Sequence, residues 1–249
     1  MGRRFGQHFL AKKSILDRIA AAACGDVAPL AIEIGPGKGA LTEALLERAE
    51  RMVAIEVDPV LVHYLRQKFA AAIETGRLTL IEGDVLKLDL AAWGPAVVAG
   101  NLPYYITSPI LEKLFAMGDQ WRRAVFMVQA EVAARLAAAP GSRDFGFLSV
   151  QTQLFAQPEI LFQVLRTAFR PPPKVDSAVV RLTPAHREMA DRAGFLRFAS
   201  AAFRQKRKTL RNNLAPVYGK DRVDALAEGR QRAEQMSVDA LITLYEKLR

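Results

Sequence analysis

Apolar runs alternate with amphipathic stretches along the first half of the chain. Five short apolar runs have the length of buried strands, and segments with apolar residues at helical spacing lie between them. The strands are predicted at residues 30–34, 52–57, 78–81, 97–100 and 125–128. Such alternation is typical of a mostly parallel sheet covered by helices on both faces. The sequence therefore predicts an α/β fold.

The alternation stops after about residue 140. Prolines 171–173 exclude a helix or a central strand there, and residues 178–182 read as a final strand. Beyond Pro184 the pattern is wholly helical. We therefore expect two domains, a sheet domain at residues 1–183 and a small helical domain at residues 184–249.

Composition narrows the class of protein. Hydrophobic residues make up 51% of the 249 residues, enough for a large core. No apolar run reaches the roughly 18–20 residues that span a bilayer, so no membrane contact is expected. The single cysteine, Cys24, excludes an internal disulfide and is expected to be a buried apolar residue. These features favour the cytoplasm, and His63 and His186 lack metal-ligand spacing, so no metal is predicted.

The net charge of +9 suggests a polyanionic partner, nucleic acid first. Residues 184–249 hold 14 Lys and Arg against 8 Asp and Glu, whereas the longer remainder holds 21 against 18. The alternative is a basic protein without such a partner. The concentration of charge in the last quarter favours RNA or DNA binding there.

A glycine-rich turn follows the first predicted strand. Gly35 and Gly37 let a ligand approach the backbone, and the helix that follows favours negative charge at its start. Glu56 lies 21 positions after Gly35, where an acidic residue typically binds ribose hydroxyls. Asp84 ends the third strand, within reach of an adenine edge. We expect these residues to meet at the carboxyl edge of one sheet, where ligands of open α/β folds bind.

The turn leaves two ligands to be compared. A dinucleotide site has the spacing Gly-x-Gly-x-x-Gly, whereas this chain has Gly-x-Gly-x-Gly preceded by Glu33. An acidic residue before the first glycine fits a ligand with an amine and no pyrophosphate. This favours S-adenosylmethionine, and the ordered acidic residues at strand ends are a stronger signal than the glycines alone.

The segment Asn101-Leu102-Pro103-Tyr104 follows the fourth strand. The Asn101 amide oxygen and a nearby main-chain carbonyl can accept hydrogen bonds from an aromatic amine, and Tyr104 can stack on its ring. An ordinary turn is the alternative, because Asn and Pro are common in turns. The set suits an enzyme that holds adenine with its amine facing an electrophile.

The sequence resembles the rRNA adenine N(6)-dimethyltransferases, in particular the bacterial KsgA type that modifies 16S RNA of the small ribosomal subunit. The resemblance covers nearly the whole chain, and the proline segment and the last stretch are its most specific parts. The matching stretches are residues 5–10, 33–37, 55–58, 83–84, 100–104, 169–182 and 203–212.

The resemblance implies a Rossmann-like methyltransferase domain with a seven-stranded sheet and a helical C-terminal domain. Its cofactor would be S-adenosylmethionine, and its partner 16S rRNA or a precursor of the small subunit, with a role in ribosome biogenesis. A monomer is expected. Cofactor contacts carried over by motif are His8, Leu10, Gly35, Glu56, Asp84 and Asn101. His8 replaces the usual Asn, so we expect cofactor binding to be kept, with an altered pH dependence. Tyr105 replaces another usual Asn, but it lies outside the four-residue core of the motif.

The implied reaction is dimethylation of the N(6) amines of two adjacent adenines in an rRNA hairpin. Asn101 and Leu102 would accept bonds from the amine, Pro103 would fix the backbone, and Tyr104 and Phe169 would cover the two faces of the base. A basic stretch, expected on a helix whose apolar face includes Phe203 and Leu210, would bind phosphates. Its residues are Arg204, Lys206, Arg207, Lys208 and Arg211.

Three alternatives stay open at this point. The first is an adenine dimethyltransferase of the same superfamily that acts on large-subunit rRNA, which the stretch at residues 203–212 disfavours. The second is an assembly factor that acts mainly by RNA binding, which the intact Asn101–Tyr104 motif disfavours. The third is a small-molecule methyltransferase, which the basic last quarter disfavours.

Overall fold

The computed structural model of the chain describes residues 9–10, 12–103, 106–185, 187 and 189–249. It divides into two compact units, each made of two segments. The first unit comprises Met1–Ala133 and Glu159–Pro184, and the second comprises Ala134–Pro158 and Ala185–Arg249.

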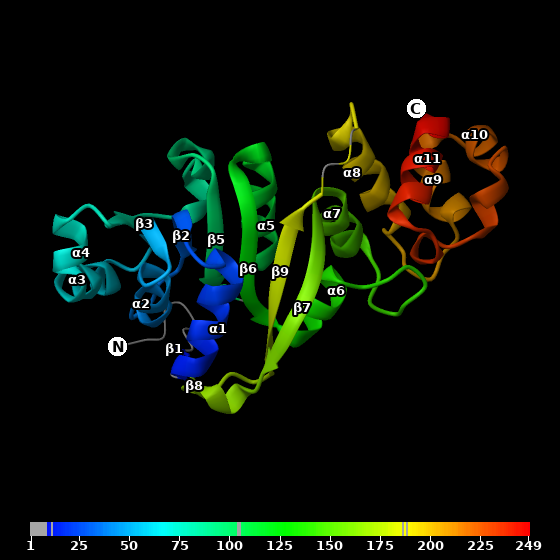
Figure 1. Cartoon of the computed structure of the whole chain (residues 1–249). Helices are drawn as coiled ribbons and strands as arrows, with labels where there is room; N and C mark the ends of the chain where they lie inside the picture. Colours follow the sequence, from blue (N-terminus) through cyan, green and yellow to red (C-terminus); the bar gives the residue numbers. More distant parts are fainter. Residues whose placement is uncertain (1–8, 11, 104–105, 186, 188) are drawn as a thin grey trace. The chain divides into compact units, whose positions relative to one another are not determined.

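A seven-stranded sheet forms the centre of the first unit (Figure 1). Neighbouring strands from β4 through β3, β2 and β5 to β6 are parallel, and β9 is antiparallel to β6. The predicted mostly parallel α/β fold is thus confirmed. In spatial order the strands are β4 (Leu78–Glu82), β3 (Ala49–Glu56), β2 (Ala28–Ile34), β5 (Ala96–Asn101), β6 (Trp121–Gln129), β9 (Ser177–Pro184) and β7 (Ala156–Val164). A separate two-stranded sheet pairs β1 (Phe9–Leu10) with β8 (Phe169–Arg170).

Helices cover both faces of the large sheet. Those of one face share a core with the strands, in which Leu16, Leu45 and Leu65 pack near Met52 and Val97. The central strands β2 and β5 are buried over most of their length and are mainly apolar without regular polar alternation, as is typical of parallel strands covered on both faces. The helices of that face are α1 (Lys13–Cys24), α2 (Ala40–Leu46), α3 (Pro59–Lys68) and α4 (Ala70–Glu74), and α5 (Thr107–Ala116) lies behind the sheet in Figure 1.

Short 3-10 helices join several of these elements. They are η1 (Val85–Lys87), η2 (Leu90–Trp93), η3 (Gly118–Gln120) and η4 (Arg166–Ala168). Asp58 caps α3 by accepting a hydrogen bond from the backbone N–H of Val60 at 3.0 Å, and Pro59 occupies the first helical position. Both residue types are preferred at these positions, which explains why the helix begins at Pro59, after the two residues that follow β3.

The second unit is helical. Its core contains Phe145, Phe195 and Phe198, which are fully buried, and Asp191 caps α8 while accepting a hydrogen bond from the Tyr245 hydroxyl at 2.6 Å. That bond ties α8 to α11. The helices are α7 (Phe147–Phe155), α8 (Arg192–Ala202), α9 (Leu210–Tyr218), α10 (Lys220–Asp224), η5 (Ala227–Arg230), η6 (Ala233–Gln235) and α11 (Val238–Leu248), and α6 (Ala130–Leu136) runs across the point where the first unit ends.

The division of the chain differs from the expected two consecutive domains in one respect. The change of unit at Pro184 lies one residue from the expected end of the sheet domain, but residues 134–158 also belong to the second unit. Val150 and Leu154 of this segment pack in its core. Local patterns give no sign of this assignment, because it depends on contacts with residues far along the chain.

The single cysteine is unreactive by its position. The Cys24 thiol is buried, and burial raises its pKa to about 11, so the reactive thiolate is disfavoured.

In the described part of the chain, no helix is both long and apolar enough to cross a bilayer.

Candidate functional site at the carboxyl edge of the sheet

The predicted cofactor residues lie at one edge of the large sheet. Strands β2, β3, β4 and β5 are parallel neighbours, so their carboxyl ends fall on the same side. Gly35 directly follows β2, Glu56 ends β3, Asp84 follows β4 by two residues and Asn101 ends β5. The structure therefore brings these four residues to the edge where ligands of open α/β sheets bind.

The glycine turn after β2 needs glycine at defined positions. Gly35 and Gly37 have φ angles of 69° and 59°, in the left-handed region that disfavours other residues. The Gly35 N–H donates to the Ile55 carbonyl at 2.9 Å, which continues the pairing of β2 with β3 into the turn. The backbone of the turn thus has no side chains between it and an approaching ligand.

Glu33, at the base of this turn, is almost completely buried, and its carboxyl oxygen accepts a hydrogen bond from the Thr42 hydroxyl at 2.6 Å. Burial is the main cause of a pKa raised to about 8; the Thr42 bond lowers the pKa, and the nearby Glu56 raises it. Glu33 is therefore largely protonated at neutral pH. It braces the start of α2 below the turn, a contact that the sequence analysis did not foresee.

Glu56 connects three backbone groups. One oxygen accepts hydrogen bonds from the N–H groups of Val57 and Asp58, at 2.9 and 3.0 Å, and the other accepts from Gly37 N–H at 3.0 Å. Burial raises the pKa of this carboxyl, and the three backbone bonds oppose that shift. Glu56 therefore holds the glycine turn against the end of β3. A carboxylate offers about four lone-pair sites, so binding to ribose hydroxyls is compatible with this arrangement.

Asp84 has a local structural task. Its side chain accepts a hydrogen bond from Leu86 N–H at 3.0 Å and caps η1, as aspartate commonly does at the start of a helix. Gly83 N–H donates to the Glu56 carbonyl at 2.9 Å, which anchors the preceding residue to β3. The position of Asp84 at the ligand edge is therefore fixed by the backbone.

The turn after β5 presents acceptor oxygens at the same edge. Leu102 is buried, and its N–H donates to the Met127 carbonyl at 3.0 Å, whereas no described residue donates to its own carbonyl. Asn101 is half-buried, and the Pro103 carbonyl accepts from Ile106 N–H at 3.2 Å. A Cβ on Gly100 would lie 2.6 Å from the Ile34 carbonyl oxygen, so only glycine lets β5 run this close to β2.

Four further residues were predicted to contact the cofactor or the substrate base. His8 and Tyr104 lie outside the described residues. Leu10 is buried in β1, where it pairs with Phe169 of β8. Phe169 is only 3% exposed and belongs to the same core cluster as Leu10. A stacking role for Phe169 therefore stays a prediction, and it requires this ring to become accessible to the base.

The expectation that the basic stretch is helical is wrong. Residues 203–209 form turns between α8 and α9. On a helix, cations three or four positions apart in the sequence lie on the same face and repel each other, which disfavours a helix here. The Asn213 side chain stabilises the turn instead, because it donates to the carbonyls of Ala202 and Gln205, at 2.7 and 3.1 Å. The Thr209 side chain then caps the start of α9.

The five predicted RNA-binding side chains are all exposed, but they differ in their partners. Arg211 pairs with Asp224 at 2.5 Å, and the Lys206 ammonium donates to the Arg143 carbonyl. No described partner engages the side chains of Arg204, Arg207 and Lys208. These three are thus the most available cations of the turn.

Sequence reasoning missed one apolar position at the edge. Val57 follows Glu56 directly, and 47% of it is exposed. An exposed apolar side chain beside the expected ribose contact is suited to the face of an adenine ring. The apolar run at residues 52–57 includes Val57, but the run alone did not predict that this side chain is exposed while the residues before it are buried.

Among the described residues, no group of three or more His, Cys, Asp or Glu side chains is placed to hold a metal ion. The only described histidine, His63, lies on α3 within 3.1 Å of the Gln67 side-chain nitrogen.

The sheet order, the glycine turn, the acidic strand ends and the Asn-Leu-Pro turn together define a methyltransferase of the S-adenosylmethionine-dependent class. The ribosomal RNA adenine dimethylase family model matches residues 1–249, and the chain belongs to this family. Its members are enzymes that transfer methyl groups from S-adenosylmethionine, so the predicted enzyme class and cofactor are confirmed.

Relatives of known name agree along nearly the whole chain. A protein of Chlorobium phaeobacteroides named ribosomal RNA small subunit methyltransferase A is 41% identical over 251 residues, which cover 99% of this chain and 91% of the relative. A protein of the same name from Acidobacterium capsulatum is 45% identical over 259 residues, with 98% and 90% covered.

Solved structures share the fold. A dimethyladenosine transferase from Plasmodium falciparum superposes with a TM-score of 0.81 at 26% identity, covering 97% of this chain and 96% of the other. The 23S rRNA methyltransferase ErmE gives 0.74 at 27% identity, with 96% and 99% covered.

Proposed function

We propose that this protein dimethylates the N(6) amines of two adjacent adenines in a hairpin of small-subunit (16S) rRNA, in the cytoplasm and as a monomer. Small-subunit precursors would be its partner, which links the activity to ribosome biogenesis. The names of relatives 41% and 45% identical support the small subunit as the target. The observation that carries the chemistry is the Asn101–Leu102 turn at the cofactor edge.

The acceptor oxygens of that turn are the reactive feature on the protein side. The amine of adenine is a poor nucleophile, because its lone pair is delocalised into the ring. Hydrogen bonds from its N–H groups to the Asn101 oxygen and the Leu102 carbonyl favour a pyramidal and more nucleophilic nitrogen. Leu102 is buried and tied to β6 through Met127, so its carbonyl is held rigidly. The rate gain then comes from positioning and electrostatics.

S-adenosylmethionine supplies a methyl carbon on a sulfonium, from which the sulfur leaves as a neutral thioether. The amine forms the new N–C bond, and its proton leaves afterwards, so no basic side chain is needed before the attack. Glu56 would bind the ribose hydroxyls, Val57 would lie against the adenine ring and Asp84 would address its edge. Gly35 and Gly37 would let the ligand approach the turn.

The substrate base has to leave its stack to reach this edge. Tyr104 is the proposed stacking partner for one face, and Phe169 for the other. His8 and Leu10 would close the cofactor side. Pro103 fixes the backbone between the acceptor oxygens and Tyr104.

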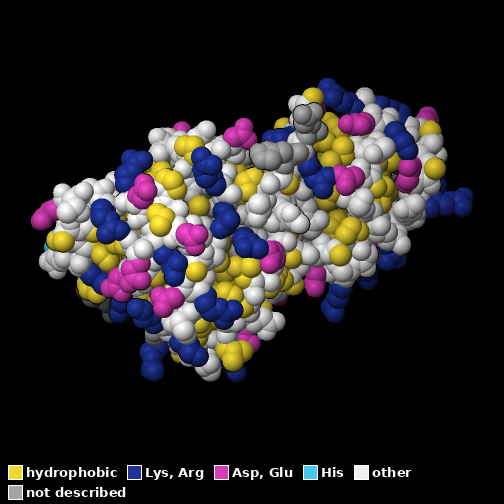
Figure 2. Space-filling view, viewed as in Figure 1, with side chains coloured by type: hydrophobic (Ala, Val, Ile, Leu, Met, Phe, Trp, Pro, Cys, Tyr) yellow, Lys and Arg dark blue, Asp and Glu magenta, His cyan; other side chains and the backbone are white. Residues whose placement is uncertain are grey.

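The basic turn at residues 203–209 is the proposed contact to RNA phosphates in the second unit. Figure 2 shows that Lys and Arg side chains are spread over the visible face and are mixed with Asp and Glu over much of it. A run of cations without nearby carboxylate partners is therefore distinctive. Arg204, Arg207 and Lys208 meet this description, and Arg211 does so less because of Asp224.

Large-subunit rRNA is the second candidate substrate. The likeness to ErmE, a 23S rRNA methyltransferase, supports it at 27% identity. The relatives named for the small subunit are considerably more similar. An assembly factor that acts mainly by RNA binding is the further alternative, and the intact acceptor turn disfavours it.

The test is methyl transfer by the purified protein from labelled S-adenosylmethionine to unmodified small and large ribosomal subunits. We expect two dimethylated adenines in small-subunit RNA, located by mass spectrometry, and none in large-subunit RNA. Asn101→Ala should abolish the transfer while cofactor affinity stays within about tenfold of wild type, since one neutral hydrogen bond contributes roughly 0.5–1.5 kcal/mol. Label in large subunits alone would refute the proposed substrate, and undiminished transfer by Asn101→Ala would refute the mechanism.

A further inference from the structure

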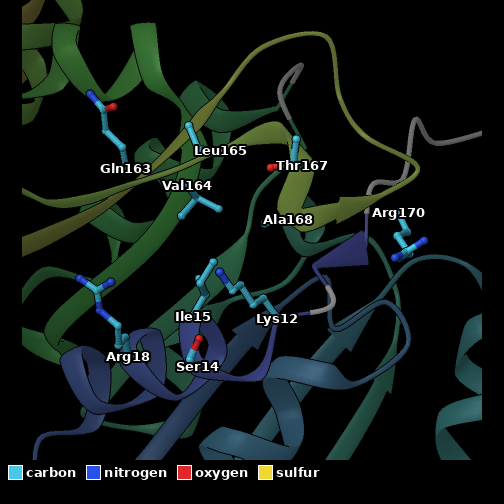
Figure 3. Close-up of a pocket in the computed structure, with 10 residues that line it drawn as sticks. All are labelled: Lys12, Ser14, Ile15, Arg18, Gln163, Val164, Leu165, Thr167, Ala168 and Arg170. Carbon is cyan, nitrogen blue, oxygen red and sulfur yellow. The ribbon is translucent and has the colours of Figure 1, made fainter.

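A basic pocket lies in the first unit, outside the residues assigned so far to the cofactor edge. It has a volume of about 520 Å³ and lies between α1, the end of β7, η4 and β8 (Figure 3). Ile15 and Val164 form an apolar part of its wall, and three cationic side chains line it, Lys12, Arg18 and Arg170. Ser14, Gln163 and Thr167 add hydrogen-bonding groups.

The charge of this pocket is not balanced from within. No aspartate or glutamate lines it, and among the described residues no carboxylate forms an ion pair with Lys12, Arg18 or Arg170. Elsewhere in the first unit, cations do have such partners, as in the pairs Lys68–Glu43 and Arg66–Glu82. Three unpaired cations around one cavity create a local field that favours an anion.

The cations come from different sides of the pocket. Figure 3 shows Lys12 and Arg18 on the helix side and Arg170 on the far side, at strand β8. The Arg18 guanidinium lies 3.6 Å from the centre of the Phe162 ring, a cation–π contact that positions the group without neutralising it. The three side chains are exposed, so a large polyanion can reach them.

The position along the chain indicates which anion fits. Arg170 directly follows Phe169, the proposed wall for the target base, and consecutive Cα atoms are about 3.8 Å apart. Lys12 lies two residues after Leu10, which pairs with Phe169 across the β1–β8 sheet. The pocket therefore begins next to the place where the proposed function puts a flipped adenine. A nucleotide held there carries phosphates on both sides of its ribose.

We propose that this pocket binds a backbone phosphate of the substrate RNA adjacent to the target adenine, with Lys12, Arg18 and Arg170 as its ligands. The inference rests on the proposed function, because the target adenine defines which phosphate is bound. It assigns an RNA contact to the first unit, in addition to the basic turn of the second. Gln163 and Thr167 are suited to the neighbouring sugar or phosphate oxygens.

The test measures how the affinity for unmodified 16S RNA depends on salt, by filter binding of the labelled RNA. The pocket variant is Lys12→Gln with Arg170→Gln, which leaves the Arg18–Phe162 contact in place. The control is Arg51→Gln with Arg122→Gln, which removes the same charge from two exposed arginines on strands of the same unit, outside the pocket. Cofactor affinity and the midpoint of thermal unfolding are measured for both, to verify folding.

Each lost phosphate contact lowers the slope of log affinity against log salt by about 0.7–0.9. We expect the pocket variant to lower the slope by about 0.7–0.9, because Lys12 and Arg170 share one phosphate, and the control to leave the slope nearly unchanged. Equal slopes for the two variants would overturn the proposal. So would tight binding of a free nucleoside monophosphate that excess 16S RNA does not displace, because the pocket would then serve a small ligand.

The failure of this inference differs from the failure of the proposed function. If wild type binds 16S RNA but transfers no methyl group, the proposed function fails, and the salt slopes still decide whether the pocket contacts RNA. If wild type transfers methyl groups and the pocket variant keeps the wild-type slope, only the pocket proposal fails. Reduced binding by Lys12→Glu at low salt, beyond that of Lys12→Gln, would further support a phosphate contact.

Discussion

Replacing Glu56 by Gln separates two tasks of one carboxylate. The side chain holds Val57 and Asp58 with one oxygen and Gly37 with the other. Glutamine keeps the shape and can place its single oxygen toward Val57 and Asp58. Its NH2 group then faces the Gly37 N–H, and two donors cannot bond to each other. The substitution therefore releases the glycine turn while it leaves the end of β3 bonded.

The magnitude follows from the bond that is lost. A hydrogen bond to a charged group contributes roughly 1.5–3 kcal/mol. Burial raises the pKa of Glu56, so removing the charge returns part of the desolvation cost, and we expect the free energy of unfolding to fall by about 1–2 kcal/mol. Loss of the ribose contact should separately lower the affinity for S-adenosylmethionine by tenfold to hundredfold, at about 1.4 kcal/mol per factor of ten.

Urea unfolding without ligand measures the first effect, and calorimetric titration with S-adenosylmethionine measures the second. Glu82→Gln is the matched control, because Glu82 is paired with Glu56 in the register of β3 and β4 but makes only an exposed ion pair with Arg66 at 3.5 Å. It should cost less than about 1 kcal/mol. If Glu56→Gln matches this control in both measurements, the carboxylate neither clamps the turn nor binds the cofactor.

Three further predictions concern the buried acid, the close strands and the basic turn. In the folded protein the pKa of the Glu33 carboxyl is raised from 4.5 to about 8, so its contribution to stability is fully present below pH 4.5 and is lost as the pH rises through 8. Glutamine resembles the protonated acid, so Glu33→Gln should reduce the change in the free energy of unfolding between pH 4.5 and 8 by a few kcal/mol, at about 1.4 kcal/mol per pKa unit. Urea unfolding at a series of pH values measures this change, and an equal pH dependence in variant and wild type would contradict a protonated Glu33. Gly100→Ala should lower the free energy of unfolding by about 1–3 kcal/mol and reduce methyl transfer, since the new Cβ would meet the Ile34 carbonyl oxygen at 2.6 Å. The control is Gly83→Ala, whose Cβ would have no neighbour nearer than 3.8 Å. If both variants lost the same free energy of unfolding, the close approach of β5 to β2 at Gly100 would not be the cause. Replacing Arg204, Arg207 and Lys208 by Gln should lower the slope of log affinity for 16S RNA against log salt by about 0.7–0.9 per phosphate contact. Arg211→Gln should change this slope less, because Asp224 already pairs with Arg211. A larger change for Arg211→Gln than for the triple variant would refute the assignment of the turn as an RNA contact.

The parts of the fold that local sequence controls were predictable. The apolar runs from 30–34 to 125–128 each coincide with a strand of the parallel sheet, and only the run 52–57 extends past its strand, by one residue. Strands buried on both faces need mainly apolar residues, which is why the runs mark them. The ends of those strands then had to meet at one edge, which placed Gly35, Glu56, Asp84 and Asn101 together. Topology made this part of the site readable without coordinates.

Features that depend on distant contacts were not predictable. The three backbone partners of Glu56 include Gly37, which lies 19 positions away in the chain. The burial of Phe169 follows from its pairing with Leu10, and the apolar residue itself gave no direction for its ring. The basic stretch was expected to be helical from its apolar flanks, whereas the Asn213 side chain, bonded to two carbonyls of the preceding segment, fixes a turn.

The helical unit is assembled from two stretches of chain that the sheet strands β7 and β9 separate. Phe145, Val150 and Leu154 come from the earlier stretch, and Phe195, Phe198 and Leu241 from the later one, yet all six fill one interior. A fragment cut out at residue 185 would leave the earlier three behind and expose the surfaces they cover. Researchers who wish to study RNA recognition by this unit in isolation must therefore join residues 134–158 to residues 185–249 through an engineered linker.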